Sequence, residues 1–166
     1  MDSTTKSFRL APMSPLILGL TVVLLALPVV FLASSAIRGG PLAFPGLLLV
    51  AIYAWVWLRF RPTLFVVHPG VLEVIWPVKR RQLRRQDISD VRLIDRQELR
   101  AKTGWGMRVG AGGLWGGFGW LWTERRGIVQ MYISRTDGLV WIECGDQRPW
   151  LITPEHPTAF VRALSR

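Results

Sequence analysis

The sequence has few residues that could carry covalent or metal-based chemistry. Its single cysteine, Cys144, excludes a disulfide within the chain, so the fold does not depend on an oxidising compartment. Its two histidines, His68 and His156, are too few for a histidine-rich metal site. No serine lies in a Gly-x-Ser-x-Gly motif, which excludes the nucleophile elbow of the α/β-hydrolases. We therefore expect no metal, no cofactor and no enzymatic activity.

Negative charge is also scarce. The chain has 11 acidic residues against 21 lysines and arginines, for a net charge of +10, and 18 of the basic residues lie within 59–166. Such a surplus favours anionic partners: phospholipid headgroups, nucleic acid or an acidic protein. Nucleic acid is the least favoured, because no helix-turn-helix or RNP-like motif accompanies the charge.

The first third of the chain, by contrast, is strongly apolar. Residues 16–37 form a run of 22 without a charge, which as a helix would be roughly 33 Å long, enough for a hydrocarbon core of about 30 Å. Residues 42–58 form a second, shorter run of about 25 Å. Because only "RGGP" joins them, we predict an antiparallel transmembrane hairpin over residues 13–60.

Aromatic and basic residues predict where the second run leaves the membrane. Aromatic side chains cluster at its end and arginines follow at once, which is typical of a membrane interface passing into the cytoplasm. The predicted interface residues are Tyr53, Trp55, Trp57, Arg59 and Arg61.

The distribution of basic residues also predicts orientation. Lys6 and Arg9 precede the first run, Arg38 alone lies in its turn, and many basic residues follow the second run. The positive-inside rule then places both termini in the cytoplasm of a multi-pass inner-membrane protein. The alternative is a signal peptide cleaved after the small residues Ser34 and Ala36, although the apolar run is longer than such peptides need.

From residue 61 onward the pattern favours a β domain, preceded by a cytoplasmic segment (1–12) and the hairpin. Short β-type runs alternate with turn residues; the seven predicted strands are at 63–68, 71–76, 88–99, 118–123, 128–134, 139–144 and 148–153. Thr153 as N-cap and Pro154 at the first helical position predict a C-terminal helix over 154–165. Seven antiparallel strands closed by a helix form an all-β sandwich or barrel of the pleckstrin-homology (PH)-like kind.

Residues 63–166 resemble the bacterial PH-like domains that often follow two transmembrane helices. The segments that carry the resemblance are "FVVHPGVLEVIW", "DISDVRLI", "GIVQMYISRTDGLVWIE" and "ITPEHPTAFVRAL". The resemblance implies a binding or scaffolding module and supplies no catalytic residues. It does not extend to a phosphoinositide pocket, because the first hairpin loop is "HPG" and carries no basic cluster.

Two segments are candidate contact sites. The basic segment "KRRQLRR" has five cations, Lys79, Arg80, Arg81, Arg84 and Arg85; it is either an anionic-lipid contact or a solvated loop. The Gly/Trp segment, residues 104–123, contains Trp105, Trp115, Trp120 and Trp122. Its eight glycines and its short uncharged run argue against a third span, and we expect a flexible connection that enters a strand at residue 118. Its tryptophans either pack under the sheet or contact the membrane or a partner.

The leading functional hypothesis is a non-catalytic adaptor that docks onto a larger integral-membrane complex through the helices and the Gly/Trp segment. The alternative is a sensor of anionic lipid headgroups that acts through the basic segment.

Overall fold

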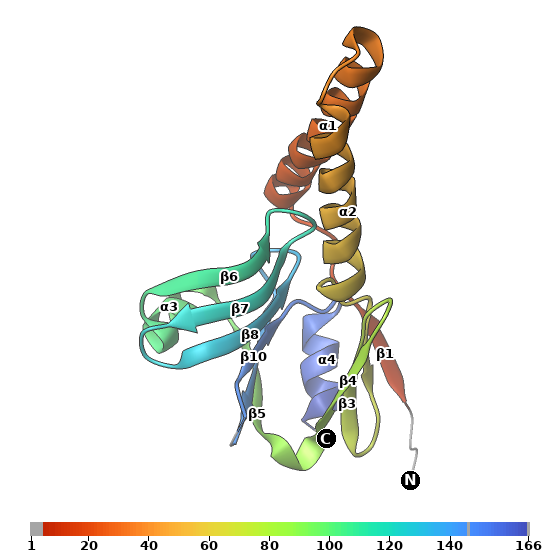
Figure 1. The fold of residues 1–166 in the computed structure, drawn as a ribbon. Helices are drawn as coiled ribbons and strands as arrows, with labels where there is room; N and C mark the ends of the chain where they lie inside the picture. The colour runs from red at the N-terminus through yellow and green to blue at the C-terminus, as the bar shows by residue number, and fades with distance from the viewer. Residues whose placement is uncertain (1–4, 146, 166) are drawn as a thin grey trace.

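The computed structural model describes residues 5–145 and 147–165. Figure 1 shows two helices, α1 (Pro15–Arg38) and α2 (Ala43–Arg59), projecting from one end of a β-rich domain. The domain contains two sheets, and helix α4 (Pro157–Leu164) lies between them.

The two projecting helices coincide with the two apolar runs. Pro15 stands in the first turn of α1, where its missing N–H costs no hydrogen bond, and Gly39 (φ +58°) ends the helix. Large apolar side chains are exposed along both helices; Leu16 and Phe44 are 76% and 75% exposed. By length and composition α1 is able to cross a membrane, whereas α2 is apolar but has only 17 residues. Within the described residues this gives one candidate span, and the second span remains a prediction.

The larger sheet has the strand order β5-β9-β10-β8-β7-β6 and is antiparallel except for the parallel pair β10–β8. Its strands are β5 (Ile88–Ile94), β6 (Gly106–Gly112), β7 (Gly117–Thr123), β8 (Gly127–Ile133), β9 (Leu139–Cys144) and β10 (Trp150–Ile152). The smaller, antiparallel sheet has the order β1-β2-β3-β4, formed by β1 (Lys6–Arg9), β2 (Leu64–Val67), β3 (Val71–Ile75) and β4 (Arg80–Arg84).

The prediction of about seven strands was too low, because the described residues form ten. Three additional strands, β1, β4 and β6, come from segments that the sequence pattern did not mark as strands; β6 is described with the candidate site below. Residues 6–9, assigned above to a separate N-terminal segment, pair with β2, although the whole apolar hairpin separates the two strands in sequence. The basic segment forms β4. Neither has the alternation of a half-buried strand, because both lie at the edges of the smaller sheet.

The main core lies where α4 faces both sheets. Phe160 of α4 is fully buried, with its ring centroid 5.3 Å from that of Phe8 and 6.1 Å from that of Phe65. Leu164, one turn later, belongs to the same cluster. This amphipathic helix therefore closes the domain by burying one face between the sheets.

The C-terminal helix begins three residues later than predicted. Thr153 does not cap it: its hydroxyl accepts the backbone N–H of Ser134 at 2.9 Å, and its carbonyl accepts that of Ala11. Pro154 forms a β-bridge with Leu10. These tertiary contacts hold the chain extended, and the helix starts at the next proline, Pro157.

Candidate functional site

The Gly/Trp segment forms an ordered hairpin. Strands β6 and β7 pair over seven residues, from Gly106 opposite Thr123 to Gly112 opposite Gly117. This corrects the predicted flexible connection: glycine-rich strands lack the side-chain alternation that marks a strand in sequence. Strand β6 is the outer strand of the larger sheet, so the hairpin extends the sheet at its edge.

The tip of this hairpin is attached to α1 by one threonine. The Thr21 hydroxyl lies 3.1 Å from the Gly113 carbonyl oxygen and accepts the backbone N–H of Trp115 at 3.0 Å. The same hydroxyl donates to the Ile17 carbonyl at 2.7 Å, and the side chain is only 2% exposed. The buried Thr21 hydroxyl of an apolar helix thus accepts a backbone hydrogen bond from a turn that lies far away in sequence.

Replacing Thr21 with valine should therefore loosen the tip. The change keeps the shape of the side chain but leaves the Trp115 N–H without its acceptor, which we expect to cost about 1–3 kcal/mol. Hydrogen exchange at the Trp115 amide measures the effect, and Thr21→Ser, which keeps the hydroxyl, is the control. Equal protection in the valine and serine variants would show that the hydroxyl does not hold the tip.

Trp115 also joins the tip to α2. Its ring lies 4.7 Å from that of Trp57, edge to face. An apolar groove of about 410 Å³ adjoins this pair, and its lining includes Leu25 and Pro28 of α1 and Val50 of α2. The β domain and the two helices are therefore packed together through the hairpin.

Strands β6, β7 and β8 carry an exposed apolar surface, which we term the aromatic face: Met107, Val109, Trp120, Trp122 and Ile128. Their exposed fractions range from 37% to 53%. Trp120 and Trp122 lie on the same side of β7 as Phe118, because side chains two residues apart in a strand share a side. Phe118 is buried in the main core, so the exposed aromatic face begins just beyond it. Trp105, 66% exposed, packs against Trp122 at 6.1 Å.

The tryptophans of the Gly/Trp segment thus have two different environments. Trp115 packs against α2, whereas Trp105, Trp120 and Trp122 stay substantially exposed rather than packing under the sheet.

The predicted interface residues cluster at the domain end of α2. Tyr53 is 8% exposed, and its hydroxyl donates to the Leu24 carbonyl at 3.0 Å. Arg59 and Arg61 stack on neighbouring aromatic rings, 5.2 Å from Trp55 and 4.3 Å from Trp57 respectively. These contacts fit a guanidinium–aromatic belt, and the interface itself remains a prediction.

The basic segment is a strand whose cations differ in their surroundings. Lys79 lies over the Trp76 ring, and burial, followed by the charges of Arg59 and Arg81, lowers its pKa. Arg81 donates to the Gln130 side chain at 2.6 Å, and Arg85 donates to the carbonyls of Ala163 and Leu164. Three of the five cations therefore contact other parts of the domain. Arg80 and Arg84 are exposed on β4, where Arg80 lies 4.0 Å from the Glu73 carboxylate.

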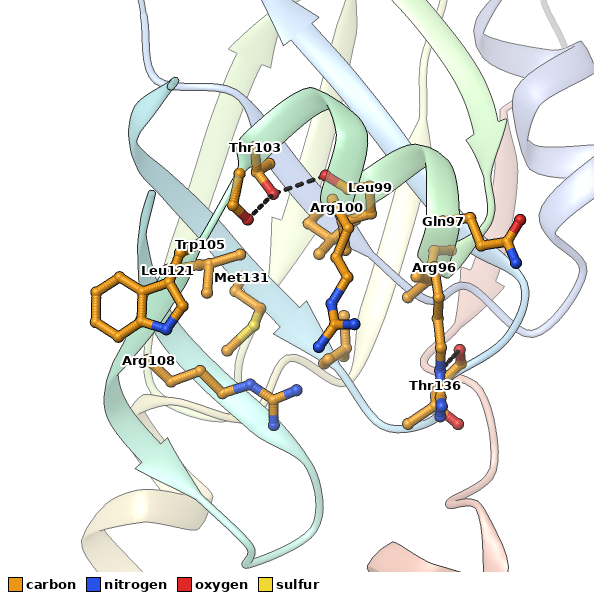
Figure 2. Close-up of a pocket in the computed structure, with 15 residues that line it drawn as sticks. Arg96, Gln97, Leu99, Arg100, Thr103, Trp105, Arg108, Leu121, Met131 and Thr136 are labelled. Carbon is orange, nitrogen blue, oxygen red and sulfur yellow. Dashed lines mark hydrogen bonds between the residues drawn. The ribbon is translucent and has the colours of Figure 1, made fainter. Parts of the chain in front are cut away.

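The opposite face of the β6–β7 hairpin lines a pocket, which sequence reasoning missed. It lies beside α3 (Arg96–Thr103), has a volume of about 620 Å³ and is shown in Figure 2. Apolar side chains from β7, β8, β9 and β10 form its floor, and arginines stand at its rim. We term it the arginine pocket.

Helix α3 was predicted as the end of a strand. Asp95 and Glu98 form a capping box: the Asp95 carboxylate accepts the Glu98 N–H at 2.7 Å, and the Glu98 carboxylate accepts the Asp95 N–H at 3.4 Å. This D-x-x-E spacing was the available signal for a helix start. Lys102 then pairs with Glu143 of β9 at 2.7 Å, which fastens the helix to the sheet.

The Glu143 pair predicts a pH dependence. Burial favours the neutral acid, but hydrogen bonds from Lys102 and Trp141, with the charges of Lys102 and Arg126, outweigh it and lower the pKa of Glu143 below its ordinary 4.5. A carboxyl group whose pKa is lower in the folded than in the unfolded state stabilises the fold at pH values above its unfolded-state pKa. This stabilisation is lost as the pH falls through the folded-state pKa. The thermal midpoint should therefore exceed that of Glu143→Gln at pH 7, and the difference should shrink below pH 4.5. A difference that does not change with pH would contradict this assignment.

Cys144 does not have the environment of a nucleophile. It is 4% exposed, and burial, with the charges of Glu143 and Asp87, raises the pKa of its thiol to about 11. Within residues 5–145 and 147–165, no three His, Cys, Asp or Glu side chains are grouped closely enough to hold a metal ion.

Two sheets with a C-terminal helix between them, carried behind two apolar helices, define a PH-like domain protein. The model of the bacterial PH domain family matches residues 64–166, which is more than half of the chain, and the chain belongs to that family. PH-like domains are generally non-catalytic modules that bind lipids or proteins. Neither the curated proteins nor the solved structures include a match to this chain.

Proposed function

We propose that this protein is a membrane-anchored adaptor that binds an integral membrane protein. In this proposal α1 and α2 cross the inner membrane as a hairpin, both termini lie in the cytoplasm, and the aromatic face contacts the partner. Exposed leucines, valines and phenylalanines along both helices support the membrane location, since such surface is costly in water.

The observation that carries the proposal is the aromatic face. Trp and Met are enriched at the centres of protein interfaces and charged residues are depleted there, and the five residues of this face include no charge. The hairpin that bears the face is attached to α1 and α2 through Thr21 and Trp57. A partner that packs against the helices in the membrane is therefore well placed to reach the face.

Photo-crosslinking in native membranes tests the contact directly. A benzophenone amino acid at position 120 or 122, at native expression, should crosslink to one defined integral membrane protein. The matched position is Leu93 on β5, which is similarly exposed at 43% but lies at the opposite end of the sheet. Equal crosslinking from both positions, or crosslinks to lipid alone from position 120, would contradict the docking proposal.

The energetic prediction concerns the paired change Trp120→Ser with Trp122→Ser. Truncating a tryptophan at the centre of an interface typically costs 2 kcal/mol or more, so co-purification of the crosslinked partner should fall by about thirtyfold. Both side chains are partly exposed, so the thermal midpoint should change little. Retention of the partner by this variant would exclude the aromatic face as its binding site.

The lipid-sensor alternative depends on the basic segment. Arg80 and Arg84 are exposed to anionic headgroups, although Arg80 also lies 4.0 Å from the Glu73 carboxylate. Lys79, Arg81 and Arg85 have closer partners within the domain. Replacing both exposed arginines with glutamine should lower binding to anionic vesicles if this alternative holds, and it should leave the crosslinks from position 120 unchanged.

A further inference from the structure

Helix α3 covers the outer face of the larger sheet only in part. Among its eight residues, Leu99 is the apolar side chain that packs against the cluster on this face. The cluster itself contains several large side chains from the sheet: Ile94, Leu121, Val129, Met131, Ile133, Leu139, Trp141 and Leu151. The arginine pocket is the recess beside Leu99, and the cluster residues at its floor are at most 9% exposed. Its volume of about 620 Å³ lies in the usual range for small-molecule sites.

The rim of the pocket is basic on two walls. Arg96 and Arg100 come from α3 and Arg108 from β6. In Figure 2 the side chain of Arg100 extends from α3 and that of Arg108 from β6, and both guanidinium groups lie on the same side of Met131 in this view. Arg96 is held at one end, where its Nε donates to the Thr136 carbonyl at 3.2 Å.

The lining of the pocket includes no carboxylate. The Glu143 carboxylate is engaged by Lys102, and neither residue lines the pocket. The Glu124 carboxylate lies beside Gly104 at the edge of the pocket. An anion between Arg100 and Arg108 would accept charge-assisted hydrogen bonds from both guanidinium groups.

We propose that the arginine pocket binds a small anionic amphiphile. A phosphate or carboxylate headgroup lies between Arg100 and Arg108, and an apolar chain extends over Met131 and Leu121. Each half of this ligand has a counterpart in the site: the apolar floor faces the chain, and the arginines at the rim face the headgroup. The proposal is independent of the aromatic face, which lies on the other side of the same strands.

Calorimetric titration of the full-length protein in zwitterionic nanodiscs tests the proposal, with protein-free discs titrated in parallel. The probes are octyl phosphate, octanoate, inorganic phosphate and octyl glucoside. We expect at least one of the two anionic amphiphiles to bind at least about tenfold more tightly than inorganic phosphate and octyl glucoside. Tighter binding of octyl phosphate identifies a phosphate headgroup, and tighter binding of octanoate a carboxylate.

Charge variants locate the binding site. Arg100→Gln combined with Arg108→Gln should weaken binding by about tenfold or more. The matched control is Arg92→Gln with Arg148→Gln, which removes the same charge from exposed positions outside the pocket and should leave the affinity unchanged. Because all four arginines are exposed, thermal midpoints close to that of the parent chain should accompany both variants.

Four results would overturn the proposal. Equal affinity for inorganic phosphate would show that the floor contributes nothing, and equal affinity for octyl glucoside would show that the arginines contribute nothing. Equal losses in the pocket and control variants would show that the anion responds only to net charge. No saturable heat from any probe would likewise exclude the site.

Discussion

Replacing Gly116 with alanine is expected to destabilise the protein by about 3 kcal/mol, which combines backbone strain with a steric clash. Gly116 has φ +147°, a conformation that residues with a side chain rarely adopt. A Cβ at this position would collide with the backbone carbonyl oxygen of Ile133 on β8 and approach Phe118 Cζ at 2.8 Å. Since the carbonyl belongs to the sheet, relief requires the hairpin to move away from β8.

The control for this prediction lies four residues away. Gly112 has no heavy atom within 4 Å of a built Cβ and no positive φ, so Gly112→Ala should change the free energy of unfolding by less than about 1 kcal/mol. Thermal unfolding of the full-length chain in detergent, followed by near-ultraviolet circular dichroism, compares the two. A common midpoint for both variants would show that the hairpin does not need a glycine at 116.

Replacing Phe160 with alanine is expected to cost about 3–5 kcal/mol, the usual range for removing a buried phenylalanine. Its ring is completely buried between the two sheets and makes edge-to-face contacts with Phe8 and Phe65. Because Phe8 belongs to β1, the loss should also release the N-terminal strand. Faster hydrogen exchange in residues 6–9 would report that release.

The matched variant is Arg162→Ala on the same helix. Arg162 is exposed, so the change should stay within about 0.5 kcal/mol while testing the same helix for any effect of alanine itself. If Phe160→Ala were no more destabilising than Arg162→Ala, α4 would not be the element that closes the domain.

The sequence predicted those elements whose signals are local. Two long apolar runs predicted the helices, and β-type runs bounded by turn residues predicted β2, β3 and most strands of the larger sheet. Turn and cap signals near Pro154 predicted a closing helix, although it starts three residues later. Each of these depends on hydrophobic periodicity or on turn chemistry, which a short window of sequence contains.

The candidate site was only partly predictable. The tryptophans of the Gly/Trp segment were selected from sequence. Only the pairing of β6 with β7 shows that Trp115 packs against α2 whereas Trp120 lies on the aromatic face. The arginine pocket was missed because Arg100 and Arg108 come from different elements. The D-x-x-E spacing at Asp95 would have revealed the helix that forms one wall.

What the sequence determined by itself is the division of this chain into an apolar helical pair and a basic β domain, because hydrophobic patterning and charge are properties of neighbouring residues. Tertiary structure alone decided how distant segments were used. Lys6–Arg9 became a strand by pairing with β2, and a β-bridge to Leu10 kept Pro154 out of the helix. The Thr21 hydroxyl accepted the Trp115 N–H at the hairpin tip. In each case the deciding hydrogen bonds join residues more than fifty positions apart, and no local pattern records the choice of partner.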